Sequence, residues 1–229
     1  MRKLSVIFLC FNLIGCTALD QAGEFVGGIS DYFLGGEDNT APPSELVDYE
    51  PEIKIKVLWK EDVGVGYDEQ SVKLVPVVYA GKIITCDREG LVEARNRQTG
   101  DLIWEVETEL PLSGCPGVGL DTVIVGSSNA DVVALDLETG ETRWDARVSS
   151  EVLAIPKVGN GTVIVRTTDG RITAFDEESG EELWGFERNV PPLSIRGVGD
   201  TIIYGDQVFV GFANGKVFAL RLRDGKQIW

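Results

Sequence analysis

The stretch Val132–Trp144, VVALDLETGETRW, carries the local signals that decide the fold of this chain. Its first part, Val132–Asp136, is a short apolar run of the kind found in buried β-strands. Asp136–Gly140 follows as a hairpin turn, because aspartate can cap local N–H groups and glycine accepts a positive φ without a Cβ clash. Thr142–Trp144 then begins the next strand. The stretch therefore predicts a β-hairpin with a tryptophan on its outer strand.

The same phrase recurs along the chain as an apolar strand, a polar turn, a glycine, three residues and a tryptophan. Its other copies are Leu91–Trp104, Ile172–Trp184 and Val217–Trp229. The four glycines of the phrase are Gly100, Gly140, Gly180 and Gly225. All five tryptophans keep this phase, at intervals of 45, 40, 40 and 45 residues: Trp59, Trp104, Trp144, Trp184 and Trp229. A strand-rich repeat of this length is typical of a β-propeller blade.

The phase of the tryptophans with the glycines argues against five unrelated core residues. We expect each indole to fill the wedge between neighbouring sheets and to find a partner for its N–H. No helix-period segment of useful length follows residue 59, so the predicted fold class is all-β. Ile53–Trp59 is predicted to be the first strand, a closing strand whose blade partners are missing, so that the ring does not close. Residues 53–229 are predicted to form a partial propeller of about four four-stranded blades, an N-terminal portion that lacks the C-terminal blades and exposes apolar strand edges.

The first residues have the pattern of an export signal. Arg2 and Lys3 precede the apolar run Leu4–Ile14, which is too short to span a bilayer comfortably. The last residues of this run with the following Gly15 and Cys16, Leu13–Cys16, resemble a bacterial lipobox, in which the cysteine thiol is the acylation site. Residues 1–15 are therefore predicted to be a lipoprotein signal peptide, and Cys16 the lipidated residue. A plain secretory signal with an incidental cysteine is the alternative.

The residue after the cysteine, Thr17, bears on localisation. In bacterial lipoproteins an aspartate at this position usually means retention in the inner membrane, so threonine implies the outer membrane. Residues 16–52 lack periodicity and contain paired glycines, paired prolines and many acids. This composition predicts a flexible tether between the lipid and the folded body.

Composition excludes several classes of function. The net charge of −16 argues against binding to nucleic acid or direct adsorption to anionic lipid. The chain has no histidine, which removes Ser–His and Cys–His pairs and most zinc and copper sites. No catalytic residue, metal ligand or cofactor is predicted. Cys86 and Cys115 remain in a compartment where disulfides persist, either bridged or as two buried thiols.

One segment breaks the repeat between Trp184 and the following strand. Val190–Gly197, VPPLSIRG, combines two stiffening prolines with Leu193, Ile195 and Arg196. Two apolar side chains beside an arginine on a rigid loop have the composition of a small binding anchor. The other interpretation is an inner strand that begins here and packs in the blade.

The phrase Ala134–Trp144 closely resembles the tryptophan-docking repeat of quinoprotein-like propellers, with variants at Ala94–Trp104, Ala174–Trp184 and Ala219–Trp229. Together with the lipobox and tether it resembles the BamB family of outer-membrane assembly lipoproteins. Pro192–Gly197 is similar to that family's Leu-Ser-Leu-Arg-Gly loop.

The resemblance implies an eight-bladed fold without enzymatic activity or bound quinone. It implies a scaffold on the periplasmic face of the outer membrane that binds the POTRA domains of BamA and assists the assembly of unfolded outer-membrane proteins. It assigns the BamA contact to Leu193, Ile195 and Arg196.

Two other classes of function share parts of this pattern. A fragment of a PQQ-dependent quinoprotein dehydrogenase would carry the same docking repeat, but would need a quinone stacking site and calcium ligands. It would commonly show adjacent cysteines, and the chain has none. A propeller lectin or sensor domain is the third class, and a ligand screen would identify it.

Overall fold

The computed structural model describes residues 44–45, 47, 53–67, 72–191 and 198–229. The chain divides into two units, Met1–Lys54 and Ile55–Trp229, and the strands of the described residues all lie in the second. All regular elements of the described residues are strands or turns. None of the described segments forms a helix with the length and apolar character needed to cross a membrane.

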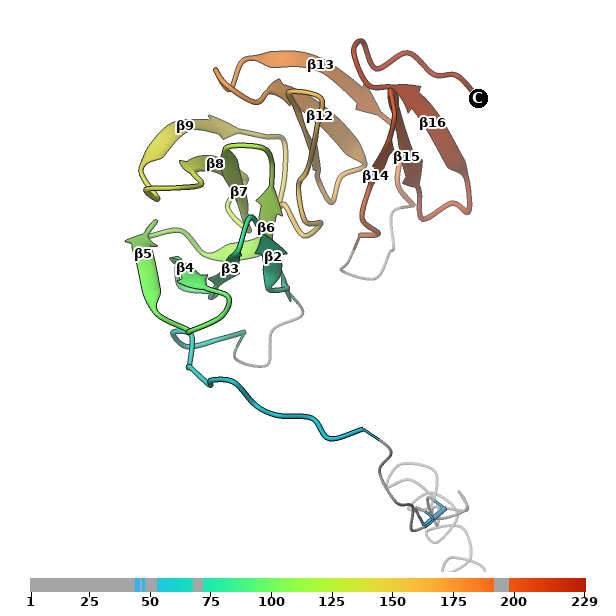
Figure 1. Cartoon of the computed structure of the whole chain (residues 1–229). Helices are drawn as coiled ribbons and strands as arrows, with labels where there is room; N and C mark the ends of the chain where they lie inside the picture. Colours follow the sequence, from blue (N-terminus) through green and yellow to red (C-terminus); the bar gives the residue numbers. More distant parts are fainter. Residues whose placement is uncertain (1–43, 46, 48–52, 68–71, 192–197) are drawn as a thin grey trace, which may run out of the picture. The chain divides into compact units, whose positions relative to one another are not determined.

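The strands form four consecutive sheets, which we call blades 1 to 4 (Figure 1). Blade 1 contains β2 (Val77–Tyr79), β3 (Lys82–Cys86), β4 (Leu91–Asn96) and β5 (Leu102–Glu107). Blade 2 contains β1 (Lys73–Leu74), β6 (Leu112–Val118), β7 (Thr122–Ser127), β8 (Asp131–Asp136) and β9 (Thr142–Arg147). Blade 3 contains β10 (Lys157–Gly159), β11 (Thr162–Arg166), β12 (Arg171–Asp176) and β13 (Glu182–Glu187). Blade 4 contains β14 (Ile202–Tyr204), β15 (Gln207–Gly211) and β16 (Val217–Arg221).

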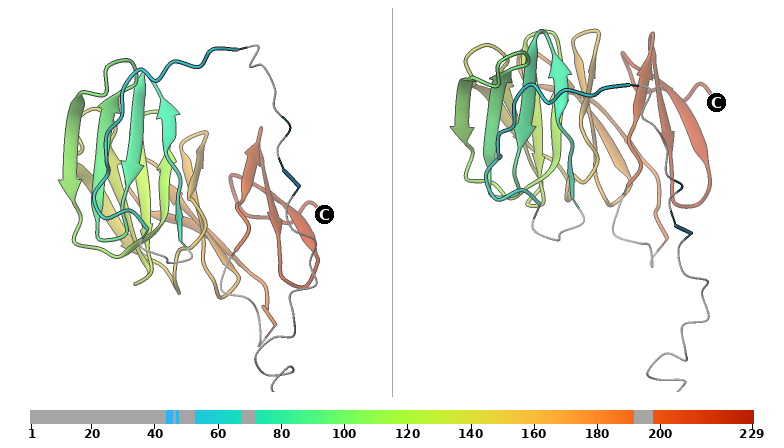
Figure 2. Two further views of the ribbon diagram at one scale, coloured as in Figure 1. Left: turned by 90° about the horizontal axis from the view of Figure 1, so that it is seen from below. Right: turned by 60° about the horizontal axis from the view of Figure 1, so that its bottom comes forward.

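Each blade is an antiparallel meander, and the blades follow one another in chain order, each facing the next (Figure 2). The exception to the meander is β1, which pairs in parallel with β6 through Lys73 opposite Gly114 and Leu74 opposite Cys115. This short strand precedes blade 1 in the sequence but is part of blade 2. It therefore joins the segment that leads into blade 1 to the sheet of blade 2.

The register explains why the tryptophans recur at one place. Ala134 lies opposite Trp144, and the ladder shifts between Ala134 and Leu135. Blades 1 and 3 repeat this arrangement, with Ala94 opposite Trp104 and Ala174 opposite Trp184. The bulge follows from the glycine-containing turn and aims the indole out of its own sheet.

The hydrophobic core lies between consecutive blades. Three clusters of buried residues are present, one at each junction of the four sheets. Their largest fully buried side chains are β-branched or leucine: Ile84, Leu112, Ile124, Leu135, Ile164, Ile172 and Leu220. Because each strand contributes to both faces of its sheet, the second and third blades are apolar on both sides, as TVIVG and TVIVR at β7 and β11 show. The predicted all-β fold class with propeller blades is confirmed.

The predicted first strand at Ile53–Trp59 is wrong. The segment carries no strand, and Ile53, Ile55 and Val57 are exposed. A strand needs a neighbour that takes its backbone hydrogen bonds, and no described residue pairs with this segment. The run of apolar residues alone was therefore not sufficient to predict its local structure.

The outer segment of blade 4 is also weaker than its sequence suggested. It is represented by one bridge, Leu220 to Gln227, and by hydrogen bonds that join Ala219 to Ile228 and Trp229. Blade 4 therefore has three strands in place of the four expected.

Candidate functional site

The residues predicted to contact a partner, Leu193, Ile195 and Arg196, lie outside the described residues, as does the predicted lipidation site Cys16. Their assignments stay predictions. The structure instead describes the joints between blades and a pocket whose lining includes Val190 and Val198, on either side of residues 192–197 in the sequence.

The joints between blades are formed by the repeated tryptophans. Trp104 of blade 1 is almost fully buried and donates its Nε1–H to the backbone carbonyl of Leu137 in blade 2, at 3.1 Å. Its ring lies against Gly140, where an added Cβ would stand 2.7 Å from the indole. The turn of the next blade therefore needs a glycine both for space and for its φ of +77°.

The same joint occurs four times. The other indole N–H groups donate to carbonyls three residues before the docking glycine: Trp59 to Arg97, Trp144 to Glu177 and Trp184 to Leu222. The corresponding glycines are Gly100, Gly180 and Gly225, and each lies under its tryptophan ring. Trp59 makes this joint with blade 1 although its own segment carries no strand. Trp229 has no such partner among the described residues and is 57% exposed, with its ring near Phe209.

The aspartates of the repeat stabilise the turns on which the tryptophans dock. The Asp136 carboxylate accepts hydrogen bonds from the backbone N–H groups of Glu138 and Thr139 and pairs with Arg143 at 2.7 Å. The Arg143 guanidinium, followed by these backbone bonds, lowers the pKa of Asp136 to about 2. Asp176 has a lowered pKa for a related reason, the hydrogen bonds from Ser179. These shifts belong to turn geometry and do not indicate a catalytic pair.

Polar contacts at the start of the second strand add to the joint between blades 1 and 2 and to the joint between blades 2 and 3. Lys82, whose side chain is only 9% exposed, pairs with Glu138 of blade 2 at 2.7 Å. Thr122 donates to the carboxylate of Glu177 in blade 3, also at 2.7 Å. Both acids belong to the turn that receives a tryptophan. The carboxylate of Glu177 therefore has a structural role in the contact between blades 2 and 3.

A disulfide joins blades 1 and 2 through Cys86 at the end of β3 and Cys115 in β6. The two Cα atoms are 6.7 Å apart. Of the two states considered from the sequence, the structure has the bridged one. Both cysteines are buried in the cluster between the blades, and the peptide bond from Cys115 to Pro116 is cis.

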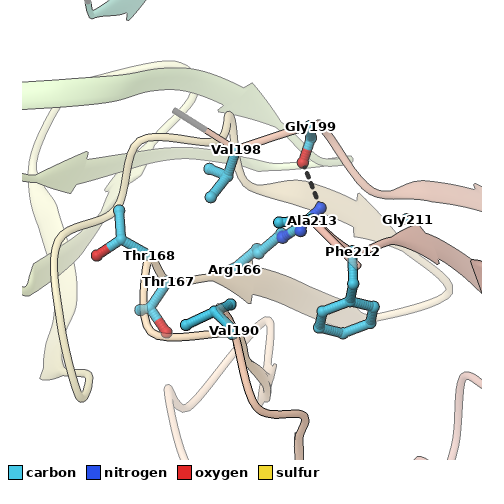
Figure 3. A pocket seen from close by; sticks show the side chains of 10 residues that line it. Arg166, Thr167, Thr168, Val190, Val198, Gly199, Gly211, Phe212 and Ala213 are labelled. Atoms are coloured by element: carbon cyan, nitrogen blue, oxygen red, sulfur yellow. Dashed lines mark hydrogen bonds between the residues drawn. The ribbon is translucent and has the colours of Figure 1, made fainter. Parts of the chain in front are cut away.

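A pocket of about 250 Å³ lies between blades 3 and 4 (Figure 3). Its lining comprises the end of β11, the turn after it, the end of β15 with the following residues, and both sides of the loop: Arg166, Thr167, Thr168, Gly170, Val190, Val198, Gly199, Gly211, Phe212 and Ala213. Val190 and Val198 flank the undescribed residues 192–197. The pocket is therefore adjacent in sequence to the predicted contact loop.

Arg166 is the charged residue of this pocket, and its side chain extends across it (Figure 3). The residue is 4% exposed, its Nη1 donates to the Gly199 carbonyl at 2.8 Å, and its guanidinium lies 5.1 Å from the centre of the Phe212 ring. Burial lowers the pKa of Arg166, and nearby Asp200 opposes that shift. Asp200 is itself paired with Lys73 at 2.9 Å.

Sequence reasoning missed this arginine, although a signal was present. The fifth residue of the second strand of the meander is Cys86 in blade 1, Gly126 in blade 2, Arg166 in blade 3 and Gly211 in blade 4. Only blade 3 places a large charged residue where the other blades have small ones. Within the described part of the chain no group of three or more acidic or cysteine residues is placed to hold a metal ion.

The fold and joints define a β-propeller of tryptophan-docking, quinoprotein-like repeats. A sequence profile described as "Outer membrane protein assembly factor BamB" matches residues 88–229. The chain belongs to this BamB family, as its resemblance to the family had suggested.

Relatives under that name share a substantial part of the sequence. The protein from Kangiella koreensis is 52% identical over 82% of this chain and 48% of its own length. The protein from Legionella pneumophila is 46% identical over 99% of this chain and 56% of its own length. The chain thus spans about half the length of the curated relatives it matches.

Solved structures agree with the fold. The crystal structure of BamB from Moraxella catarrhalis superposes with a TM-score of 0.64 at 27% identity, over 70% of this chain and 48% of that one. A quinohemoprotein alcohol dehydrogenase from Comamonas testosteroni matches with a TM-score of 0.53 at 20% identity, over 73% of this chain and 34% of the enzyme. The second likeness concerns the fold alone.

Proposed function

We propose that this chain acts as a non-enzymatic scaffold lipoprotein in the assembly of outer-membrane proteins. The observation that carries the proposal is membership of the BamB family, whose profile covers residues 88–229. The relatives that share the chain's sequence are named as outer membrane protein assembly factors. The repeated joints give a rigid body on which loops between blades can be presented to a partner.

In this proposal the partner is BamA, contacted through its POTRA domains, within the β-barrel assembly complex. Leu193 and Ile195 enter a shallow apolar groove on the partner, and Arg196 pairs with an acid or a carbonyl there. The protein is held at the periplasmic face of the outer membrane by lipid on Cys16. It helps to present unfolded outer-membrane proteins for insertion.

The test is co-purification with BamA of the protein expressed from its own gene, with Leu193→Ala and Arg196→Ala combined. Truncating a desolvated anchor typically costs about 2 kcal/mol or more, roughly thirtyfold in affinity. We expect the double variant to lose BamA while its melting temperature is unchanged. A blade-packing role for the loop predicts a lowered melting temperature together with the loss. A folded variant that binds normally would refute the loop assignment.

The proposal excludes the enzyme alternative, which has its own test. The purified protein is mixed with pyrroloquinoline quinone and calcium and assayed for alcohol oxidation. We expect no turnover. Quinone-dependent oxidation would overturn the non-enzymatic assignment, whatever the binding experiment shows.

A further inference from the structure

The guanidinium of Arg166 is buried with much of its hydrogen-bonding capacity unused. Its Nη1 donates to Gly199, but its Nε has no hydrogen-bond partner. Buried polar groups in proteins are nearly always paired, and leaving one unpaired costs free energy. An arginine that is 4% exposed with a free Nε–H is therefore suited to a ligand that is absent from the isolated chain.

The free edge of this guanidinium has a defined chemistry. With Nη1 engaged by Gly199, the other edge of the guanidinium carries Nη2 and the Nε–H, and the Nε–H has no hydrogen-bond partner. Two parallel N–H groups on one edge match the two oxygens of a carboxylate. The arginine is also held in place by Phe212, so little side-chain freedom remains to be lost on binding.

The walls of the pocket limit what can accompany the carboxylate. Val190, Val198 and Phe212 are apolar, and Arg166 is the sole formal charge among the lining residues. One guanidinium neutralises a singly charged group, whereas a phosphate would remain under-neutralised. Apolar walls suit the short aliphatic stem of an aspartate or glutamate. The volume of about 250 Å³ holds a side chain of that size.

The charges near the pocket do not cancel this preference. Asp200 lies close enough to act on Arg166, but its carboxylate is paired with Lys73, which also donates to the Val198 carbonyl. Two cations, Arg166 and Lys73, thus lie near one acid, Asp200, just before blade 4 in the chain. Asp169, in the turn after β11, accepts a hydrogen bond from Thr167 and does not line the pocket.

We propose that the Arg166 pocket receives one acidic side chain of the polypeptide that docks on this face of the propeller. Val190 and Val198, which lie on either side of residues 192–197 in the sequence, line the pocket, so the pocket is next in the chain to the proposed contact with the partner. The source of the carboxylate rests on the proposed function, in which that partner is BamA. The chemistry of the site is independent of the partner's identity.

The chemistry is tested by NMR on the chain labelled with nitrogen-15. The probe is N-acetyl-glutamate methylamide, which carries one side-chain carboxylate, and the control is its glutamine counterpart. The Arg166 Nε–Hε signal is assigned as the one lost in Arg166→Lys. We expect a saturable shift of that signal with the glutamate probe and none with the glutamine probe. An unmoved signal, or equal shifts with both probes, would overturn the site.

The source is tested by affinity for the purified periplasmic domains of BamA. Losing a charge-assisted bidentate contact should weaken binding about tenfold in Arg166→Gln, and Arg166→Lys should recover only part of it. Melting temperatures of both variants provide the folding control. A folded Arg166→Gln with unchanged affinity would refute insertion of a partner acid. A wild-type chain that saturates with the glutamate probe but does not bind BamA would refute the proposed function and retain the carboxylate site.

Discussion

The indole of Trp104 lies directly on Gly140 of the following blade, so that a single added carbon on the glycine would stand 2.7 Å from the ring. The tryptophan and the glycine are both in the repeated phrase, but they belong to successive copies of it. The phrase therefore encodes the two halves of a joint in two different blades. The contribution of a joint to stability can be tested by changing either the tryptophan or the glycine.

Gly140→Ala is expected to destabilise the propeller for two separable reasons. A non-glycine residue in the left-handed region costs roughly 1–2 kcal/mol, and overpacking against Trp104 adds about 1–3 kcal/mol. Gly161→Ala is the matched control, because its φ of +72° is similar but no atom lies within 4 Å of its added Cβ. Urea unfolding of both variants measures the difference. Equal losses of stability would mean that the tryptophan contact contributes nothing.

Asp136→Asn is expected to remove a pH-dependent part of the stability. The folded pKa of about 2 lies below the ordinary value of 3.8, so the carboxylate stabilises the fold above pH 3.8 and loses this effect as the pH falls toward 2. The contribution should not exceed about 1 kcal/mol, because the pair with Arg143 is partly solvated. Asparagine keeps the turn, as Asn96 does in blade 1 by accepting from Gln98 and Thr99.

The measurement is urea unfolding of wild type and Asp136→Asn across that pH range. The difference in unfolding free energy should be largest above about pH 4 and should shrink as the acid becomes protonated. A difference that stays constant down to pH 2 would show that the charge of Asp136 is not responsible.

Breaking the disulfide is expected to weaken the junction of blades 1 and 2. The bridge closes a loop with a sequence separation of 29, for which chain entropy predicts roughly 3–4 kcal/mol of stabilisation. Cys86→Ser with Cys115→Ser should therefore lower the melting temperature of oxidised protein. Wild type in reductant should melt like the variant. A linked peptide carrying both cysteines in an unreduced digest verifies the bridge, and free thiols at both positions would contradict it.

Cys16→Ser is expected to abolish lipidation of the protein in its bacterial host. Metabolic labelling with palmitate should mark wild type alone, and fractionation should place the label in the outer membrane, as Thr17 implies. Cys10→Ser is the control, since that cysteine lies within the predicted signal peptide. Equal labelling of wild type and Cys16→Ser would refute the lipid anchor.

The joints were predictable because their determinants are local. The turn length from Asp136 to Gly140 sets the register, the register aims Trp144, and the same chemistry recurs in each copy. The resemblance to the BamB family followed from these repeats together with the lipobox and the tether, which are local sequence patterns as well. The strand proposed at 53–59 failed because a strand depends on a neighbour, and hydrophobicity does not reveal whether one is present.

The pocket was not predictable from the motif, because it depends on elements brought together by tertiary packing. Arg166 ends an ordinary apolar strand, and its partners Gly199 and Phe212 come from the next blade. The parallel pairing of β1 with β6 was not predictable from the sequence either, because a strand of two residues shows no hydrophobic periodicity. Both features involve residues that depart from the repeat, and such departures are where a repeat sequence is least informative about packing.

The identity of the joints has an evolutionary consequence. The contact between blades 1 and 2 uses the same residue types as the contact between blades 3 and 4. Each of these blades therefore presents a tryptophan to the following blade or a glycine turn to the preceding one, in a form that is interchangeable between joints. Duplication or loss of one repeat in the gene would therefore leave compatible tryptophan–glycine joints between the remaining blades. Such a chain can change its number of modules by recombination without first evolving a new interface, while loops such as the one beside Arg166 diverge toward separate partners.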